Sequence, residues 1–196
     1  MMSSEKNPTR QRILETTWKL LENGGGGAVR MSDIAKAAGI SRQALYLHFP
    51  NRAELLVATT RHVDEVHDID ALLAASRSAG GGAARLETWI AAWGNYIPRI
   101  YGIGKALMAM QDSDAEAAAA WDGRMQAVRE GCAAAVAALA RDGLLTPALT
   151  ETEAVDLLWS FLSVRVWEQL CLTCGWDQAR YVAHLQRSLA RALCGG

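Results

Sequence analysis

The chain has 196 residues, of which 51% are hydrophobic, and its formal net charge is −1. This apolar fraction is enough for a sizeable core, and the length allows one large or two small domains. No run of eighteen apolar residues occurs, and the first thirty residues lack a signal-peptide pattern. We therefore expect a cytoplasmic protein without a membrane partner. Four prolines, seventeen glycines and few β-branched runs favour helices, so the predicted fold class is all-α.

Charge is unevenly distributed along the chain. Residues 1–53 hold eight Lys or Arg against four acids, a net charge of +4, whereas residues 54–196 carry a net charge of −5. A basic N-terminal region on an acidic body is typical of a compact DNA-binding protein.

The first predicted helix begins after Asn7, which can cap it, with Pro8 in the first turn. Residues 31–49 then predict two short helices joined by a tight turn. Gly39 suits the left-handed end of the first of these helices, and Ser41 can cap the second. Helix, three-residue turn and helix in this order are typical of a helix-turn-helix, whose second helix enters the DNA major groove.

The second helix of this motif presents a polar face. Leu45 and Phe49 stand four residues apart and face the core, so the residues between and before them point outward. The predicted outward or edge positions are Ser41, Arg42, Gln43, Ala44, Tyr46, Leu47 and His48. Guanidinium, amide, phenol and methyl groups on an outward face suit base edges and phosphates.

The segment from about Thr9 to Leu56 resembles the tetracycline-repressor (TetR) family of transcriptional regulators. The resemblance is carried by Ile34-Ala35, by Ala38-Gly39-Ile40-Ser41, and by the run from Leu45 through Tyr46-Leu47-His48-Phe49-Pro50-Asn51-Arg52 to Leu55-Leu56. It implies a ligand-responsive regulator, most simply a repressor, and not an enzyme. It also implies a homodimer on a pseudo-palindromic double-stranded DNA operator, released when a small effector enters the body.

The residue types suggest a role for each outward side chain. We expect Arg42 to contact guanine, Gln43 to contact adenine, and the Ala44 methyl group to contact thymine. The resemblance implies that Tyr46, His48 and Arg52 contact phosphates. Leu47 either contacts a thymine methyl group or makes no contact.

The start of the motif departs from the pattern of the family, in which Thr or Ser precedes the first helix and contacts phosphate. Arg30 and Ser32 stand there instead. Either Arg30 replaces the hydroxyl group with a charge, or Ser32 caps a helix that starts slightly later.

Six further helices bring the predicted total to about nine. They cover 52–67, 83–97, 105–111, a long stretch from 115, 151 to about 173, and a last stretch from 178, with a loose connection at 68–82. The predicted domains are 1–50, a DNA-binding domain, and 51–196, a ligand-binding and dimerisation domain.

The helix predicted from 151 is apolar on all sides, so it needs cover on all sides. We expect one face to pack inward and another to meet a second subunit, together with the last helix. The predicted dimer interface comprises Trp159, Leu162, Val166, Leu170, Val182, Leu185 and Leu189.

Aromatic and thioether side chains on the middle helices suggest a cavity for a flat, apolar effector that is cationic or aromatic. The predicted ligand-binding residues are Trp89, Trp93, Tyr96, Met108, Trp121, Met125, Phe161 and Arg165. These aromatic residues could instead fill the core, and Arg165 pairs either with an anionic ligand or with an internal carboxylate such as Glu168.

An all-helical enzyme or small-molecule carrier is the alternative from another class. The sequence shows no nucleophile–base pair, no phosphate-binding glycine loop and no His-x-x-x-His pair. Cys171 and Cys174 have C-x-x-C spacing, but only His184 is a plausible additional zinc ligand. We expect reduced thiols, no metal and no cofactor.

Overall fold

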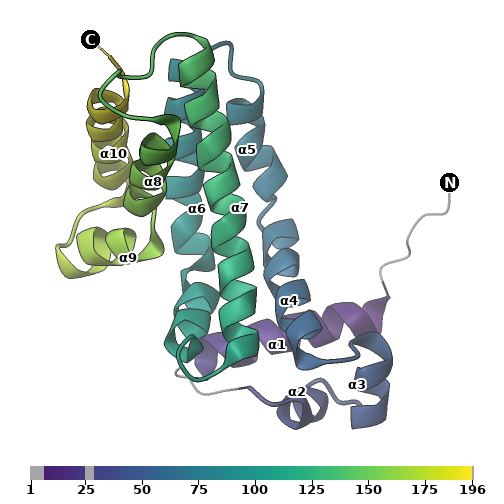
Figure 1. Ribbon diagram of the computed structural model, residues 1–196. Helices are drawn as coiled ribbons and strands as arrows, with labels where there is room; N and C mark the ends of the chain where they lie inside the picture. Colours follow the sequence, from purple (N-terminus) through teal and green to yellow (C-terminus); the bar gives the residue numbers. More distant parts are fainter. Residues whose placement is uncertain (1–6, 25–28, 196) are drawn as a thin grey trace, which may run out of the picture. The chain divides into compact units, whose positions relative to one another are not determined.

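The computed structural model describes residues 7–24 and 29–195, and in these ranges the chain forms helices and no strand (Figure 1). The predicted all-α class is confirmed. Ten α-helices and one short π-helical segment are present among the described residues, against about nine helices predicted.

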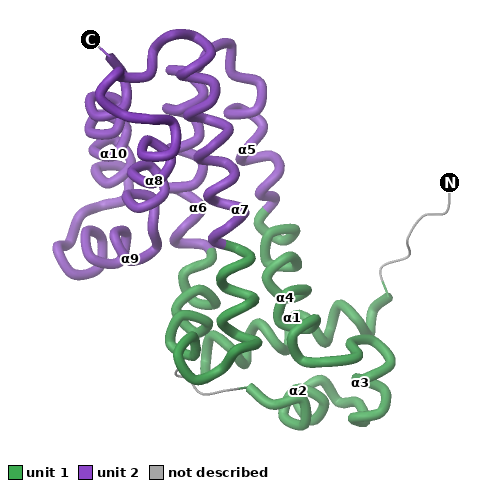
Figure 2. Tube along the Cα trace, in the orientation of Figure 1, with its two compact units in different colours: residues 1–67, 100–124 green, residues 68–99, 125–196 purple. Residues whose placement is uncertain are grey.

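The chain divides into two compact units, each built from separate stretches of sequence (Figure 2). Unit 1 comprises residues 1–67 and 100–124, and unit 2 comprises residues 68–99 and 125–196. The predicted functional boundary at residue 50 stays a prediction, because compactness alone does not assign DNA binding or ligand binding to either part.

Unit 1 contains four complete helices and parts of two long ones. The complete helices are α1 (Pro8–Asn23), α2 (Met31–Ala37), α3 (Arg42–His48) and α4 (Arg52–Val66). Helix α1 packs against α2 and α4, and α2 packs against α3. Their apolar stripes meet in a closed core that includes Ile13, Leu14, Leu21, Ile34, Leu45, Phe49, Leu55 and Leu56. This core fixes which face of α3 remains outside.

Unit 2 contains the remaining helices. They are α5 (Ile69–Arg77), most of α6 (Gly82–Met110) and α7 (Ala115–Arg141), α8 (Glu151–Phe161), α9 (Val164–Trp167), the π-helical segment Glu168–Thr173 and α10 (Gln178–Leu193). Leu86, Ile90, Tyr96, Val136, Leu139, Leu158, Tyr181, Leu185 and Leu189 are buried in its core. The apolar side of α10, which the sequence analysis assigned to a dimer interface, is buried in this core.

The segment predicted as a loose connection at 68–82 contains helix α5. Asp68 adopts a left-handed conformation (φ 48°), and its side chain caps the new helix by accepting a hydrogen bond from the Ala71 N–H. Glycines at 80–82 favoured the loop prediction, but the helix ends before them.

A single helix, α6, replaces the two helices predicted at 83–97 and 105–111. Pro98 lies inside it and cannot donate a main-chain hydrogen bond to the carbonyl of Gly94. The side-chain amide of Gln178 on α10 donates to that carbonyl instead, at 2.8 Å. The helix therefore continues through the proline, which the sequence predicted as its end.

The continuous helix predicted from 151 to about 173 is interrupted after Phe161. The carbonyl of Leu162 accepts a hydrogen bond from the indole Nε1 of Trp93 at 2.8 Å. Ser163 caps α9 by accepting from the Val166 N–H, and the chain then continues into the π-helical segment. In a continuous helix the Val166 N–H would donate to the Leu162 carbonyl. Because each of these groups bonds to a side chain instead, the helix is interrupted here.

Among the described residues, no helix is both long enough and apolar enough to span a membrane.

Candidate nucleic-acid interface and effector pockets

The turn between α2 and α3 has the geometry that its residue types predict. Gly39 has a φ of 66°, where a side chain would be strained, and the N–H of Ile40 bonds back to the carbonyl of Ala35 at 3.0 Å. Ser41 Oγ accepts a hydrogen bond from the Ala44 N–H at 3.0 Å and caps α3. The turn thereby fixes the direction in which α3 leaves α2.

Helix α3 buries one face and exposes the other. Leu45 and Phe49 lie in the core of unit 1, whereas Arg42, Gln43, Tyr46 and Leu47 are exposed. Ala44 and His48 are half-buried at the edges of the exposed face. Leu47 is 83% exposed, so its aliphatic side chain is accessible to another molecule.

A basic residue near this face was missed by the sequence analysis. The guanidinium of Arg10, on α1, lies over the ring of Phe49, 4.8 Å from its centroid. This contact places a cation beside the C-terminal end of α3. Arg10 and Phe49 are 39 positions apart, so no local sequence pattern indicated this contact.

The structure decides between the two alternatives for Arg30 and Ser32. Helix α2 begins at Met31 with Arg30 at the N-cap position, where its side chain makes no capping hydrogen bond. Ser32 is therefore inside the first turn and does not cap a later start. Both side chains are exposed, so both remain available to a partner.

Arg52 differs from its predicted role. Its guanidinium pairs with Asp114 at 2.8 Å and with Glu116 at 3.0 Å, and its Nε donates to the carbonyl of Val29 at 2.7 Å. The side chain is only 12% exposed. Arg52 therefore ties the start of α4 to the start of α7 inside unit 1, which corrects the predicted phosphate contact.

Asp114 also caps α7, since its Oδ1 accepts from the N–H groups of Glu116 and Ala117. The hydrogen bond from Arg52, followed by these capping bonds, keeps the pKa of Asp114 below its usual range although burial opposes the shift. The capping residue of α7 is thus charged at neutral pH and held in place from two sides.

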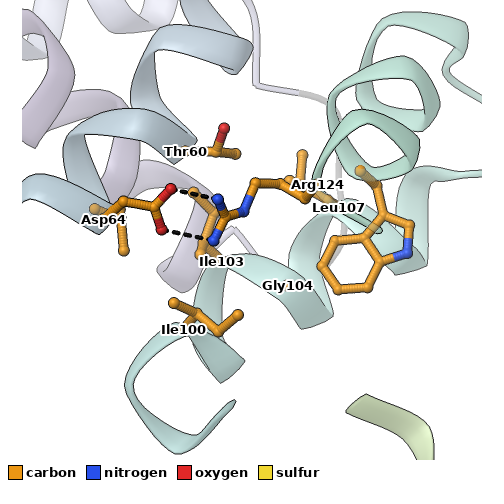
Figure 3. Close-up of a pocket in the computed structure, with 9 residues that line it drawn as sticks. Thr60, Asp64, Ile100, Ile103, Gly104, Leu107 and Arg124 are labelled. Carbon is orange, nitrogen blue, oxygen red and sulfur yellow. Dashed lines mark hydrogen bonds and ion pairs between the residues drawn. The ribbon is translucent and has the colours of Figure 1, made fainter. Parts of the chain in front are cut away.

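A second ion pair, part-buried, closes a small pocket between α4, α6 and α7 of unit 1 (Figure 3). Asp64 accepts two hydrogen bonds from the guanidinium of Arg124, the one to Nη2 at 2.6 Å. Apolar side chains such as Ile100, Ile103 and Leu107 surround the pair. The free volume of this pocket is about 10 Å³, so the ion pair itself fills the space.

Unit 2 has two larger pockets. One, of about 230 Å³, lies between α5, α6 and α7, with Ser76, Arg77, Arg85, Trp89, Gly131 and Ala134 among its lining residues. The other, of about 360 Å³, is a groove between α6 and α10, with Glu87, Ala183, Arg187 and Ala190 among its lining residues. Each is large enough for a small organic molecule.

The predicted ligand-binding residues are not gathered at one site. Trp89 lines the α5–α6–α7 pocket, and Trp121 lines the pocket of unit 1. Trp93 and Tyr96 lie in the closed core of unit 2, and Met108 and Met125 are half-buried, the first in unit 1 and the second in unit 2. Packing in the core, rather than contact with a ligand, accounts for the positions of Trp93 and Tyr96.

Phe161 and Arg165 lie at the surface of unit 2. Phe161 is 42% exposed, and Arg165 is 68% exposed with its guanidinium 4.0 Å from Glu168. Of the two alternatives for Arg165, the structure contains the internal carboxylate. Neither residue is among those that line the three pockets described above.

The predicted dimer interface needs correction at four positions. Leu162, Val182, Leu185 and Leu189 are buried in the core of unit 2, which leaves them almost no surface for a second subunit. The remaining three, Trp159, Val166 and Leu170, are half-buried. The sequence pattern identified an apolar face but could not show that the same chain already covers most of it.

The four cysteines are free. Cys132 is buried, Cys171 and Cys194 are half-buried, and Cys174 is exposed. Burial raises the pKa of Cys132 to about 12, because a thiolate in an apolar core is poorly solvated. Within the described ranges no group of three or more His, Cys, Asp or Glu side chains is arranged to hold a metal ion.

The N-terminal segment matches a known family. Residues 13–59 fit the family model described as "Bacterial regulatory proteins, tetR family". The chain is 34% identical over 64 residues to the nucleoid occlusion factor SlmA of Marinomonas sp. (33% of this chain, 32% of that protein). It is 38% identical over 64 residues to the transcriptional regulator TtgR of Pseudomonas putida (33% and 30%). The aligned part therefore spans about a third of the curated relatives, and relatives of different function share it.

Similarity over the whole chain is structural. A transcriptional regulator from Saccharomonospora viridis, solved in complex with choline, superposes with a TM-score of 0.74 over 97% of this chain and 100% of that one, at 17% sequence identity. At this identity the likeness establishes the fold alone. The helix-turn-helix geometry and the family match together identify residues 13–59 as a domain of the tetR family of bacterial regulatory proteins.

Proposed function

We propose that this chain is a DNA-binding transcriptional regulator, most simply a repressor, that binds a pseudo-palindromic operator as a homodimer. The exposed face of α3, held by the Gly39–Ser41 turn within the segment that matches the family, carries this proposal. Arg42 and Gln43 would read base edges, while Tyr46 and His48, with Arg30 and Ser32, would contact phosphates. Arg10 joins the phosphate contacts in place of Arg52.

A second copy of the chain would complete the reading of DNA. Phe161 is 42% exposed and Leu172 is 55% exposed, and Val166 and Leu170 between them are half-buried. This apolar surface on unit 2 supports a dimer contact at α8, α9 and the π-helical segment. Two copies of α3 related by a two-fold axis would address half-sites about 34–36 Å apart.

A small organic effector would regulate binding. The pockets of unit 2 support this part of the proposal, because their volumes suit small molecules. Effector binding to the body would then lower affinity for the operator, and the protein would act as a ligand-released repressor.

The test is selection of bound sequences from a library of random duplex DNA, followed by titration of the best sequence at several salt concentrations. We expect a two-fold symmetric consensus and an affinity that falls steeply with salt, as phosphate contacts require. Bound sequences without any consensus, from a protein that remains monomeric, would overturn the proposal.

Two variants separate base reading from backbone contact. Arg42→Ala should relax sequence preference at one position of each half-site and cost about 1–3 kcal/mol on the preferred sequence. Tyr46→Phe should weaken binding to all sequences alike, since a phosphate carries no sequence information. The reverse pattern would contradict these assignments.

A further inference from the structure

The pocket between α5, α6 and α7 of unit 2 carries an excess of positive charge. Two arginines, Arg77 and Arg85, are among its lining residues, and none of the lining residues is acidic. A concave site with one sign of charge and apolar walls favours a ligand of the opposite sign. The occupant should therefore be an anion.

The two arginines are not equivalent. Arg77 pairs with Asp70 along the exposed side of α5, at 2.8 Å, so its charge is already matched. The guanidinium of Arg85 has no hydrogen-bonding or ion-pair partner among the described residues, and the residue is half-buried. Arg85 is the group with unused donors, and a carboxylate can accept two of them at once.

Trp89 forms a flat wall beside Arg85. A Cβ at position 131 would lie 2.0 Å from its ring, so the indole reaches the α7 backbone where Gly131 leaves room. Ala127 and Ala134 flank that glycine on the pocket side, and their short side chains leave the volume of about 230 Å³ open. An indole with small neighbours suits a flat aromatic body.

The other two pockets lack this combination. In the α6–α10 groove, Arg187 is accompanied by Glu87, so that lining has no excess charge. In unit 1, Arg124 is bound to Asp64 and the volume is about 10 Å³. Of the three pockets, only the α5–α6–α7 pocket offers open volume together with an unmatched cation.

We infer that the α5–α6–α7 pocket binds small aromatic carboxylates, with the carboxylate on Arg85 and the ring beside Trp89. Its use as the effector site rests on the proposed function, whereas binding itself does not. This inference narrows the effector from an unspecified apolar molecule to an organic acid.

Calorimetric titration with 2-naphthoate and with its neutral counterpart 2-naphthamide tests the inference. The two share a ring system and differ in charge, so wild-type protein should bind naphthoate at least tenfold more tightly. Arg85→Gln should remove this preference and weaken naphthoate binding at least tenfold. Arg187→Gln, in the α6–α10 groove where Glu87 balances the charge, is the matched control and should leave binding unchanged.

Ala134→Leu provides an independent variant, because it fills the pocket without removing a charge. It should abolish binding of both compounds while thermal unfolding shows a folded protein. Naphthoate that does not bind, that binds no better than naphthamide, or that binds undiminished to the Arg85 or Ala134 variants would overturn the inference.

A parallel operator titration separates this inference from the proposed function. If selected DNA binds and naphthoate does not, the regulator proposal stands and the carboxylate site fails. If naphthoate binds through Arg85 but no operator exists, the site stands and the regulator proposal fails.

Discussion

The side-chain amide of Gln178 donates to the carbonyl of Gly94, the acceptor that Pro98 leaves without a helical partner. The same Gln178 accepts a hydrogen bond from the indole Nε1 of Trp167 at 2.9 Å. One side chain on α10 thus provides a hydrogen-bond partner both for the Gly94 carbonyl of α6 and for the indole N–H of buried Trp167. This explains why a helix with an internal proline is tolerated in the middle of unit 2.

Gln178→Ala should lower the free energy of unfolding by about 1–2 kcal/mol, since it leaves two part-buried polar groups without partners. In a Pro98→Ala background the loss should be smaller by about 1 kcal/mol, because the restored N–H can bond to the Gly94 carbonyl. Urea unfolding of the four proteins measures this coupling.

Gln186→Ala is the control for that cycle. Gln186 bonds to the carbonyl of Glu87 in an exposed part of α6 without a proline, so its loss should cost less than about 0.5 kcal/mol. Equal costs for Gln178→Ala with and without Pro98 would contradict the role of Gln178.

Two glycines of α7 should respond oppositely to the same substitution. Gly123→Ala adds a Cβ that meets nothing within 4 Å and should stabilise the protein by about 0.5–1 kcal/mol, because alanine loses less entropy in a helix. Gly131→Ala drives a Cβ into the Trp89 ring and should destabilise it by about 1–3 kcal/mol. Thermal unfolding of both variants would show whether the indole has room to move; a stabilising Gly131→Ala would mean that it has.

Arg52→Gln should destabilise the protein by about 1–3 kcal/mol, since Asp114 and Glu116 lose their cation. Arg77→Gln, which removes an exposed ion pair with Asp70, should cost less than about 1 kcal/mol. If Arg52 contacted DNA phosphates instead, its substitution would reduce the salt dependence of DNA binding and leave stability unchanged.

The Arg52–Asp114 pair also predicts a dependence of stability on pH. The pKa of Asp114 is lower in the folded protein than in the unfolded chain, so its contribution is complete above about pH 4 and is lost as pH falls through the folded pKa. Denaturation midpoints between pH 2 and pH 6 should therefore fall more steeply in the wild type than in Arg52→Gln. Parallel curves would show that Asp114 is not stabilised by Arg52.

Leu47, with its exposed aliphatic side chain on α3, should contact a thymine methyl group. Replacing that thymine with uracil in the selected operator should weaken wild-type binding about fourfold, the value of one buried methyl group. Leu47→Ala should bind both operators alike and should unfold at the wild-type temperature. Loss of affinity for every sequence would instead indicate a backbone contact.

The cysteines should react with iodoacetamide in the order of their exposure and thiol acidity. Cys174 is exposed, whereas burial, followed by the charge of Asp177, raises the pKa of half-buried Cys171. Cys132, with a pKa of about 12 in the core, should react only when urea unfolds the protein. Mass spectrometry of peptides over time at pH 8 gives this order; early labelling of Cys132 would contradict its burial.

The sequence by itself determined the local features of this protein. These features act within a few residues of the chain: glycine at a left-handed turn, serine or asparagine at the start of a helix, and apolar residues four positions apart. They therefore located α1 to α4 and the exposed face of α3. The caps of α8 and α10, at Thr150 and Asp177, are contacts of the same short range.

The tertiary structure decided what depends on partners far along the chain. The continuation of α6 past Pro98 needs Gln178, 84 residues from Gly94, and the end of α8 needs Trp93, 69 residues from Leu162. Arg52 forms ion pairs inside unit 1 because the fold brings Asp114 and Glu116, at the start of α7, next to it. Local spacing cannot reveal such contacts, since a hydrogen bond or an ion pair forms wherever the folded chain brings donor and acceptor together.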